Sequence, residues 1–385
     1  MRYRKISDRR LHDGKIFAHK GFVNAPNADA LGIGGASRRL VAEQWNTKVW
    51  NPGKPGPNVS EGNAQNKKGK KMKYRGHETF SIRKNWLAKG IEAVSRNPGI
   101  FMDKSFEPMD ELGIGRNMVV SLRYWMRALH LVEERKNLET KKTVSEFTKL
   151  GKIIKENDKY VEEAGTLWLL QAELASERDF ATSWYFFFNE FNLTEFTKED
   201  FVSALKSFDQ MNSEKGDGGK ETALSSFETD FECIVNTYVS RFKNAAETDP
   251  EDNIESPFAE LGLVDSVGGG RKLFRKVIPP KQNIPPLVFL ALLYKMAGKT
   301  EDAEKPETSE TEYKNLEIPL SDIQNKKCGA GKLLNLDVIT LMDILSELET
   351  RALVKVIRTA GLDVVRLEVG VTYEECARLY YKELN

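Results

Sequence analysis

Four residues between positions 116 and 127 have side chains suited to contacting a nucleic acid. Arginine donates to phosphate oxygens and, like asparagine, can pair with the edges of bases. If this segment is a helix, one face about 80° wide around the helix axis holds Arg116, Arg123 and Arg127, together with Val120 and His130. Apolar residues occupy the opposite face: Met118, Leu122, Trp125 and Leu129.

This pattern predicts a recognition helix of the helix-turn-helix kind. Its first residues, Arg116 and Asn117, would meet base edges, and Arg123 and Arg127 would meet phosphates. The surrounding segment 73–137 holds 12 basic and 8 acidic side chains, and we include its Arg83 and Lys84 among the nucleic-acid-binding residues. The alternative is a solvated helix face whose arginines pair with neighbouring glutamates.

A second candidate for chemistry is the motif Gly76, His77, Glu78 and Thr79. A zinc hydrolase needs further ligands, and the only other histidine after this motif is His130. We therefore expect neither a metal nor a catalytic residue here. Our interpretation is that the motif begins the first helix, with Thr79 as its N-cap.

The glycine-rich segment Cys328-Gly-Ala-Gly-Lys332 differs from a phosphate-binding loop at two positions. That pattern needs glycine where Lys326 stands and serine or threonine where Leu333 stands. We expect no cofactor and no enzymatic activity. The cysteines Cys233, Cys328 and Cys376 are far apart in sequence and are interpreted as small buried side chains.

Helices and a hairpin must position the basic residues. Apolar spacing predicts a first helix over 80–97, a short second helix ending at 112–115, and a third helix over 116–131. Two short strands, 131–135 and 140–144, follow. Three helices and a hairpin are the order of a winged-helix module.

The remainder of the chain is predicted to be mainly helical. Residues 145–245 favour helices throughout, and the aromatic residues between Trp168 and Phe191 are expected in the core, with a partner groove as the alternative. The segment 246–286 is rich in loops, and Pro286 begins a helix over 287–297. The last part predicts a helix over 336–350, strands over 353–358 and 364–368, and a helix over 373–383.

We therefore expect a mainly α, multi-domain helical protein with winged-helix-like modules and short β-hairpins. The predicted parts are a basic, disordered extension (1–72), an N-terminal winged-helix-like domain (73–145), a helical domain (146–260) and a C-terminal domain (261–385) with a winged-helix-like unit at about 318–385. The extension holds 15 Lys and Arg against 5 Asp and Glu, typical of a nucleic-acid-binding arm or of an upstream addition. No apolar run reaches the roughly 18 to 20 residues of a membrane helix, so we expect a cytoplasmic protein.

Several motifs in order resemble a bacterial family known as domain of unknown function 4007. They span about residues 73–385 and include Gly76-His-Glu-Thr-Phe80, Trp86-Leu-Ala-Lys-Gly90, Leu112-Gly-Ile-Gly-Arg-Asn-Met118, Ala181-Thr-Ser-Trp-Tyr185 and Pro257-Phe-Ala-Glu-Leu-Gly-Leu263. Proteins similar to this family are encoded beside phosphoadenosine-phosphosulfate-reductase-like enzymes and ATPases of DNA phosphorothioation and phage-defence islands.

The resemblance and the basic helix together predict a DNA-associated accessory protein of such a system. Its expected partners are double-stranded DNA and a phosphoadenosine-phosphosulfate-reductase-like protein or ATPase of the same system. The alternative is a non-catalytic interaction scaffold or regulator for a sulfur-transfer or ATPase partner. Fold alone does not decide between these two classes of function.

Overall fold

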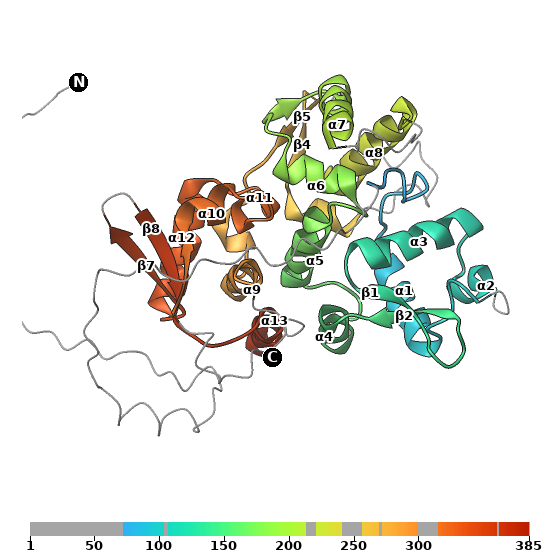
Figure 1. Ribbon diagram of the computed structural model, residues 1–385, viewed down its shortest axis with the longest axis horizontal. Coiled ribbons are helices and arrows are strands. Elements are labelled where there is room, and N and C mark those ends of the chain that lie inside the picture. The colour runs from blue at the N-terminus through green and yellow to red at the C-terminus, as the bar shows by residue number, and fades with distance from the viewer. Residues whose placement is uncertain are drawn as a thin grey trace, which may run out of the picture. The chain divides into compact units, whose positions relative to one another are not determined.

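The computed structural model describes residues 72–103, 107–212, 221–240, 256–268, 272–298, 315–359 and 362–384. All of them belong to one compact unit, Ser60–Asn385, and the architecture is mainly α with small antiparallel sheets (Figure 1). The basic extension expected over 1–72 lies outside the described residues, apart from Met72. Among the described helices, none is long and apolar enough to cross a membrane.

The N-terminal part has the predicted order of three helices followed by a hairpin. These elements are α1 (Trp86–Arg96), α2 (Pro108–Leu112), α3 (Arg116–Ala128), β1 (Val132–Lys136) and β2 (Thr143–Phe147). Gly113 ends α2 in the left-handed conformation that glycine adopts without strain. The strands β1 and β2 are antiparallel, with Glu134 opposite Ser145.

The first helix begins six residues later than predicted. Its N-cap is Asn85, and Thr79, which was expected to cap it, has a φ of 71° and lies outside the helix. The reason is tertiary: the carbonyl of Phe80 accepts hydrogen bonds from Trp125 Nε1 and Ser121 Oγ of α3. These bonds hold the segment before α1 as a turn against α3, so Thr79 is not an N-cap.

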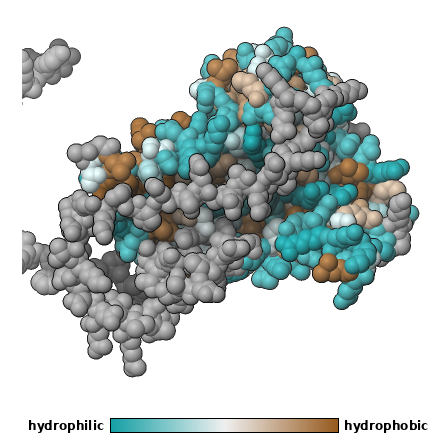
Figure 2. Space-filling model, viewed as in Figure 1, coloured by the Kyte–Doolittle hydropathy of each residue, from teal (hydrophilic) through white to brown (hydrophobic). Residues whose placement is uncertain are grey.

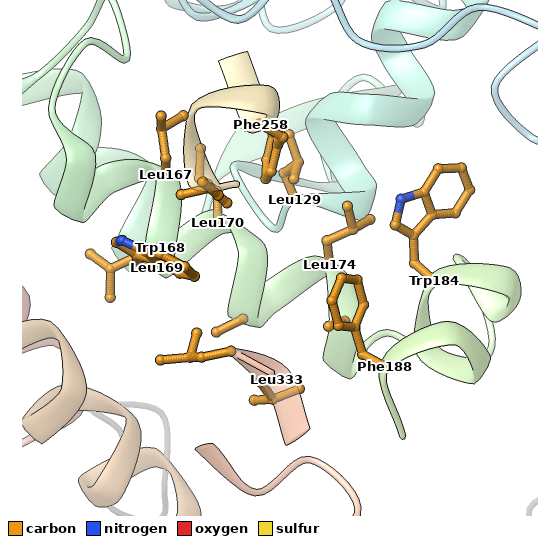
Figure 3. Close-up of a cluster of buried hydrophobic side chains, with 14 of the residues drawn as sticks. Leu129, Leu167, Trp168, Leu169, Leu170, Leu174, Trp184, Phe188, Phe258 and Leu333 are labelled. Atoms are coloured by element: carbon orange, nitrogen blue, oxygen red, sulfur yellow. The ribbon is translucent and has the colours of Figure 1, made fainter. Parts of the chain in front are cut away.

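The middle of the chain is built around a buried helix. Its helices are α4 (Lys149–Asn157), α5 (Ala164–Ser176), α6 (Thr182–Asn189), α7 (Lys198–Asn212) and α8 (Leu224–Tyr238). Every residue of α5 from Gly165 to Ala175 is buried, as expected for a helix that is apolar on all sides. Figure 3 shows its leucines and Trp168 surrounded by Leu129, Trp184, Phe188, Phe258 and Leu333, which come from other parts of the chain.

The aromatic residues predicted for the core are buried. Trp168, Trp184 and Phe187 are at most 1% exposed, and edge-to-face ring contacts connect Phe187 to Phe196 and Trp184 to Trp125. This confirms core packing rather than an exposed partner groove. Cys233 and Cys376 are also buried as predicted, whereas Cys328 is partly exposed.

A three-stranded sheet interrupts the helices, contrary to the prediction of helix throughout 145–245 and loop over 246–286. It consists of β3 (Glu195–Phe196), β5 (Leu273–Lys276) and β4 (Val264–Val267) in the order β3-β5-β4. Phe196 lies opposite Phe274, and both rings are buried. Strands of two to four residues are too short for alternation to reveal them.

The C-terminal part contains the predicted helix, hairpin and helix. Its elements are α9 (Pro286–Met296), β6 (Leu316–Pro319), α10 (Leu320–Asn325), α11 (Ala330–Leu333), α12 (Val338–Thr350), β7 (Val354–Thr359), β8 (Leu362–Leu367) and α13 (Tyr373–Leu384). The sheet order is β6-β8-β7, so β6 adds an edge strand that the sequence did not predict. Helix α9 begins at Pro286 as expected and packs against α13.

Elements on both sides of the expected domain boundaries pack together. Helix α13 contacts α4, and helices α9 and α11 contact α5. The outer face of this assembly in Figure 2 is mostly hydrophilic, with hydrophobic side chains scattered in small groups. The compact unit therefore presents polar surface around a continuous core.

Replacing Trp125 by alanine should destabilise the protein by about 3 to 5 kcal/mol, because it empties a fully buried site on the apolar face of α3. The free energy of unfolding from urea titrations measures this effect. Val120→Ala on the exposed face of the same helix is the control and should change stability by about 0.5 kcal/mol or less. Equal losses in the two variants would contradict the assignment of the two faces.

Candidate nucleic-acid interface

The first turn of α3 is exposed, as predicted for the residues expected to meet base edges. Arg116 and Asn117 follow Gly115, which takes the N-cap position in an extended conformation. No acidic residue lies in this turn, and Arg116 forms no ion pair with a described residue. One turn further along, Val120 is 43% exposed. This end of the helix therefore offers free donors to solvent.

The second half of the predicted basic face is partly neutralised. Arg123 Nε donates to Glu134 Oε1 over 2.6 Å, and Arg127 lies 3.2 Å from the other oxygen of the same carboxylate. The two arginine side chains remain 36% and 32% exposed, whereas Glu134 is only 13% exposed. One carboxylate from β1 is thus shared by two guanidinium groups, which leaves an excess of positive charge.

Lys73 joins these arginines although the sequence analysis did not single it out. Its Nζ lies 4.2 Å from the centre of the Phe180 ring, and Arg127 Cζ lies 4.3 Å from the same ring centre. Burial and the positive charges of Arg127 and Arg123 lower the pKa of Lys73. We call Lys73, Arg123 and Arg127 the basic cluster. Its members come from two segments, and the ring between them comes from a third, so helical spacing alone revealed only part of it.

The hairpin adds basic side chains but no net charge, because residues 132–147 hold four basic and four acidic residues. Lys136 lies two residues after Glu134 on β1, so the two side chains share one face of the strand. Lys136 and Lys141 form no ion pair with described residues, whereas Arg135 pairs with Glu133 and Lys142 pairs with Asp103. Lys136 and Lys141 are therefore the hairpin cations that remain available to a ligand among the described residues.

Arg83 and Lys84 are not brought to the basic cluster. The guanidinium of Arg83 lies 5.5 Å from the ring centre of Trp86, and Lys84 pairs with Glu260 over 3.2 Å. Both follow Phe80, whose carbonyl contacts Ser121 and Trp125 on the side of α3 opposite to the basic cluster. The two predicted binding residues therefore lie apart from the other four.

His77 is a buried structural residue that connects three segments of the chain. Its Nε2 donates to Asp230 Oδ1 over 2.8 Å, and the other carboxylate oxygen accepts from Ser183 Oγ over 2.5 Å. The amide of Arg75 also donates to Asp230. Gly76 allows this close packing, because a Cβ atom there would lie 2.6 Å from the ring of Tyr124. Glu78 and Thr79 are exposed and do not join this network.

The structure offers no candidate metal centre among the residues that it describes. No group of three or more His, Cys, Asp or Glu side chains is arranged there to hold an ion. His77 has one carboxylate neighbour, Asp230, whose oxygens already accept three hydrogen bonds. The chemistry that the exposed face of α3 offers is hydrogen-bond donation and positive charge.

His130, at the end of α3, connects the N-terminal part to α5. Its Nε2 lies 2.7 Å from Glu177 Oε2, and its Nδ1 lies 3.6 Å from Glu173. Burial opposes the charged imidazole, but the hydrogen bond from Glu177 and the negative charges of Glu173 and Glu177 outweigh it and raise the pKa of His130. His130 therefore belongs to this ionic contact rather than to the basic cluster.

Replacing Asp230 by alanine should cost about 2 to 4 kcal/mol of stability, because His77, Ser183 and the Arg75 amide would lose their buried acceptor. Thermal and urea unfolding measure this loss. Glu232→Ala on the same helix is the control, since it removes only an exposed ion pair with Lys198, worth about 0 to 1 kcal/mol. A tolerated Asp230→Ala change would show that the network is dispensable for folding.

The contribution of His130 to protein stability, measured as the difference between the parent protein and His130→Ala, should decline as the pH rises through the raised pKa of His130. A raised folded-state pKa means that the ionic contact stabilises the protein fully below the unfolded-state value of about 6.5 and is lost above the folded-state value. Urea unfolding between about pH 6 and pH 9 measures this decline. Over this pH range the parent protein should lose free energy of unfolding relative to His130→Ala. Parallel pH profiles for the two proteins would rule out this contribution.

Two solved structures share this fold. They are the magnesium ion-bound crystal structure of SspB and a further crystal structure of SspB, each 23% identical to this chain. Their TM-scores are 0.66 and 0.65, and each match covers 80% of this chain and 87% of the SspB chain. A comparison with curated proteins gave no match.

The family resemblance found in the sequence motifs is confirmed. Residues 74–381 match the family described as "Protein of unknown function (DUF4007)". The match includes α1 to α13 almost completely and with them the basic cluster, apart from Lys73, which lies one residue before it. On this match, the chain belongs to the DUF4007 family.

Proposed function

We propose that this protein is a DNA-associated accessory protein of a DNA phosphorothioation-type modification or phage-defence system. In this proposal the basic cluster binds the phosphate backbone of duplex DNA, and Arg116 and Asn117 at the exposed start of α3 meet base edges. The observation that carries the proposal is the convergence of Lys73, Arg123 and Arg127 on one face, where Glu134 pairs with both arginines and Glu78 acts on Lys73. Three positive charges against two favour a polyanionic ligand.

The order of the N-terminal elements supports the proposal. A short helix, a glycine turn and a helix with an exposed, acid-free first turn follow one another in the order found in helix-turn-helix proteins, where the second helix enters the major groove. The following hairpin, with Lys136 and Lys141, would act as the wing along the backbone. The role in phosphorothioation is inferred from the family resemblance, which implies genes encoded beside enzymes of that chemistry.

We propose a non-catalytic role, in which the protein brings DNA to a partner. The expected partner is a phosphoadenosine-phosphosulfate-reductase-like protein or an ATPase of the same system. The face formed by α3 and the hairpin offers donors and positive charge, which suit binding, and Glu134 is already occupied by two arginines. Bond breaking would then be the task of the partner.

A second candidate function is that of a protein-interaction scaffold. The ion pairs of Glu134 with Arg123 and Arg127 favour it, because both arginines already have a carboxylate partner. Leu138 at the tip of the hairpin is 82% exposed, and an exposed apolar side chain suits a protein surface better than a phosphate backbone. In this function α3 contacts protein only.

Removing two members of the basic cluster tests the DNA proposal. The double variant Lys73→Ala, Arg127→Ala should weaken binding to all duplex sequences alike and flatten the slope of log affinity against log salt by about 0.9 for each lost phosphate contact. Glu134→Gln should act in the opposite direction and tighten binding, because it removes the carboxylate that pairs with both Arg123 and Arg127. Fluorescence anisotropy titrations at several salt concentrations measure both effects.

The matched control is Lys84→Ala, which removes a lysine of the same part of the chain that pairs with Glu260 away from the cluster. Its DNA affinity and salt slope should equal those of the parent protein. If the double variant binds DNA as tightly as the parent but loses binding to a protein partner, the scaffold function is correct and the DNA assignment is wrong.

A further inference from the structure

A cavity of about 250 Å³ lies far along the chain from the basic cluster. It is formed by the segment after α6, the end of β5, and the loops that connect α10, α11 and α12. None of its lining residues belongs to the N-terminal helices or the hairpin. Two lysines and several amide side chains face it together: Lys276, Lys332, Asn192, Gln324, Asn325 and Asn335.

Lys276 places an amine in this cavity without a carboxylate beside it. Its Nζ donates to the carbonyls of Phe187 and Phe191, each at 2.5 Å, at the C-terminal end of α6. The ammonium also lies 4.5 Å from the centre of the Phe187 ring. Burial and the charge of Lys332 lower the pKa of Lys276 to about 7. Backbone carbonyls are the hydrogen-bond partners of this amine in the described structure, and a bound anion would favour its charged form.

The second lysine is also without a counter-ion in the described structure. Lys332 Nζ donates to the neutral Asn192 Oδ1 over 3.0 Å. The carboxylate that lines the cavity, Asp337, is engaged as the N-cap of α12, where its Oδ1 accepts from the amide of Thr340. Two amines therefore share one small cavity, and the nearby acid already stabilises a helix end.

Gln324 also lines this cavity, and one of its side-chain atoms lacks a hydrogen-bond partner. Its Nε2 donates to the carbonyl of Leu336 over 2.8 Å, which fixes the orientation of the amide group. Its Oε1 is buried and has no hydrogen-bond partner. Gly331 keeps the backbone of Gln324 close, because a Cβ at position 331 would lie 2.6 Å from the Gln324 carbonyl oxygen. A ligand that donates a hydrogen bond to Oε1 would satisfy this buried acceptor.

We propose that this cavity is a binding site for a small oxyanion that carries a hydroxyl group, with inorganic phosphate or a small phosphate compound as the chemical class. Lys276 and Lys332 bind the negative charge, and Gln324 Oε1 accepts a hydrogen bond from the hydroxyl group. Lysine binds phosphate as a point charge. The glycine-rich segment 328–332 is therefore no phosphate loop, but it supplies one of the two lysines of an anion site.

Isothermal titration calorimetry of the full chain with inorganic phosphate and with sulfate tests this site. Near pH 7.5 phosphate carries a hydroxyl group and sulfate carries none, so sulfate leaves Gln324 Oε1 unpaired. We expect phosphate to bind about tenfold or more tightly than sulfate, the factor that one unsatisfied buried acceptor causes. Lys332→Gln should weaken phosphate binding at least about tenfold, as expected for the loss of one charged contact.

Three further variants separate this site from others. Lys326→Gln, in the same loop but outside the cavity, should bind phosphate like the parent protein. Arg127→Ala should also bind like the parent, which excludes the basic cluster as the phosphate site. Gln324→Met should abolish the preference for phosphate over sulfate, and it provides an independent test if Lys332→Gln does not fold.

The proposal is wrong if phosphate gives no saturable heat, or if Arg127→Ala abolishes the heat while Lys332→Gln does not. Equal affinity of the parent protein for phosphate and sulfate would exclude Gln324 from the site and overturn the hydroxyl requirement. DNA binding by Lys332→Gln should equal that of the parent, so the failure of this site and the failure of the DNA proposal are distinguishable.

Discussion

Helix α5 is buried on all of its faces, and the elements around it are placed by the need to cover it. Its three buried polar side chains each need a partner, because an unpaired polar group in a core is costly. Thr166 forms hydrogen bonds with Asp158 and Tyr381. Gln171 forms them with Tyr238 and with the carbonyl of Leu333. Glu173 accepts hydrogen bonds from Lys295 and Tyr373. These bonds connect α5 to α8, α9, α11 and α13. The N-terminal and C-terminal halves are thus joined through one helix.

The basic cluster depends on this arrangement. The ring that lies between Lys73 and Arg127 belongs to Phe180, which follows α5 directly and precedes α6. The buried contact of His77 with Asp230 and Ser183 fixes the segment that carries Lys73 against α6 and α8. A change in the packing of α5 or α6 would therefore move the cations of the cluster relative to one another. The candidate interface is a product of the whole compact unit rather than of α3 alone.

The two lysine-containing sites differ in how their charge is balanced, and this suggests different ligands. The basic cluster is partly exposed and shares one carboxylate, so its field extends into solvent and suits a long polyanion. Lys276 is enclosed and compensated by backbone carbonyls, so its charge acts over a short distance on a ligand inside the cavity. In our two proposals, the first site attracts DNA by long-range charge, whereas the second selects a small anion by size and by hydrogen bonding.

The sequence by itself determined the helical character, the two faces of α3, the hairpin after it, the buried aromatic residues and the family, because these follow from local spacing and ordered motifs. Only the tertiary structure decided how the basic cluster is completed, because Glu134 pairs with Arg123 and the ring of Phe180 lies beside Lys73. It also decided that His77 contacts Asp230. The shared cavity of Lys276 and Lys332 likewise depends on the tertiary structure. Periodicity records which residues share a face of one element, but contacts between distant segments arise only when helices such as α5 are covered on every side.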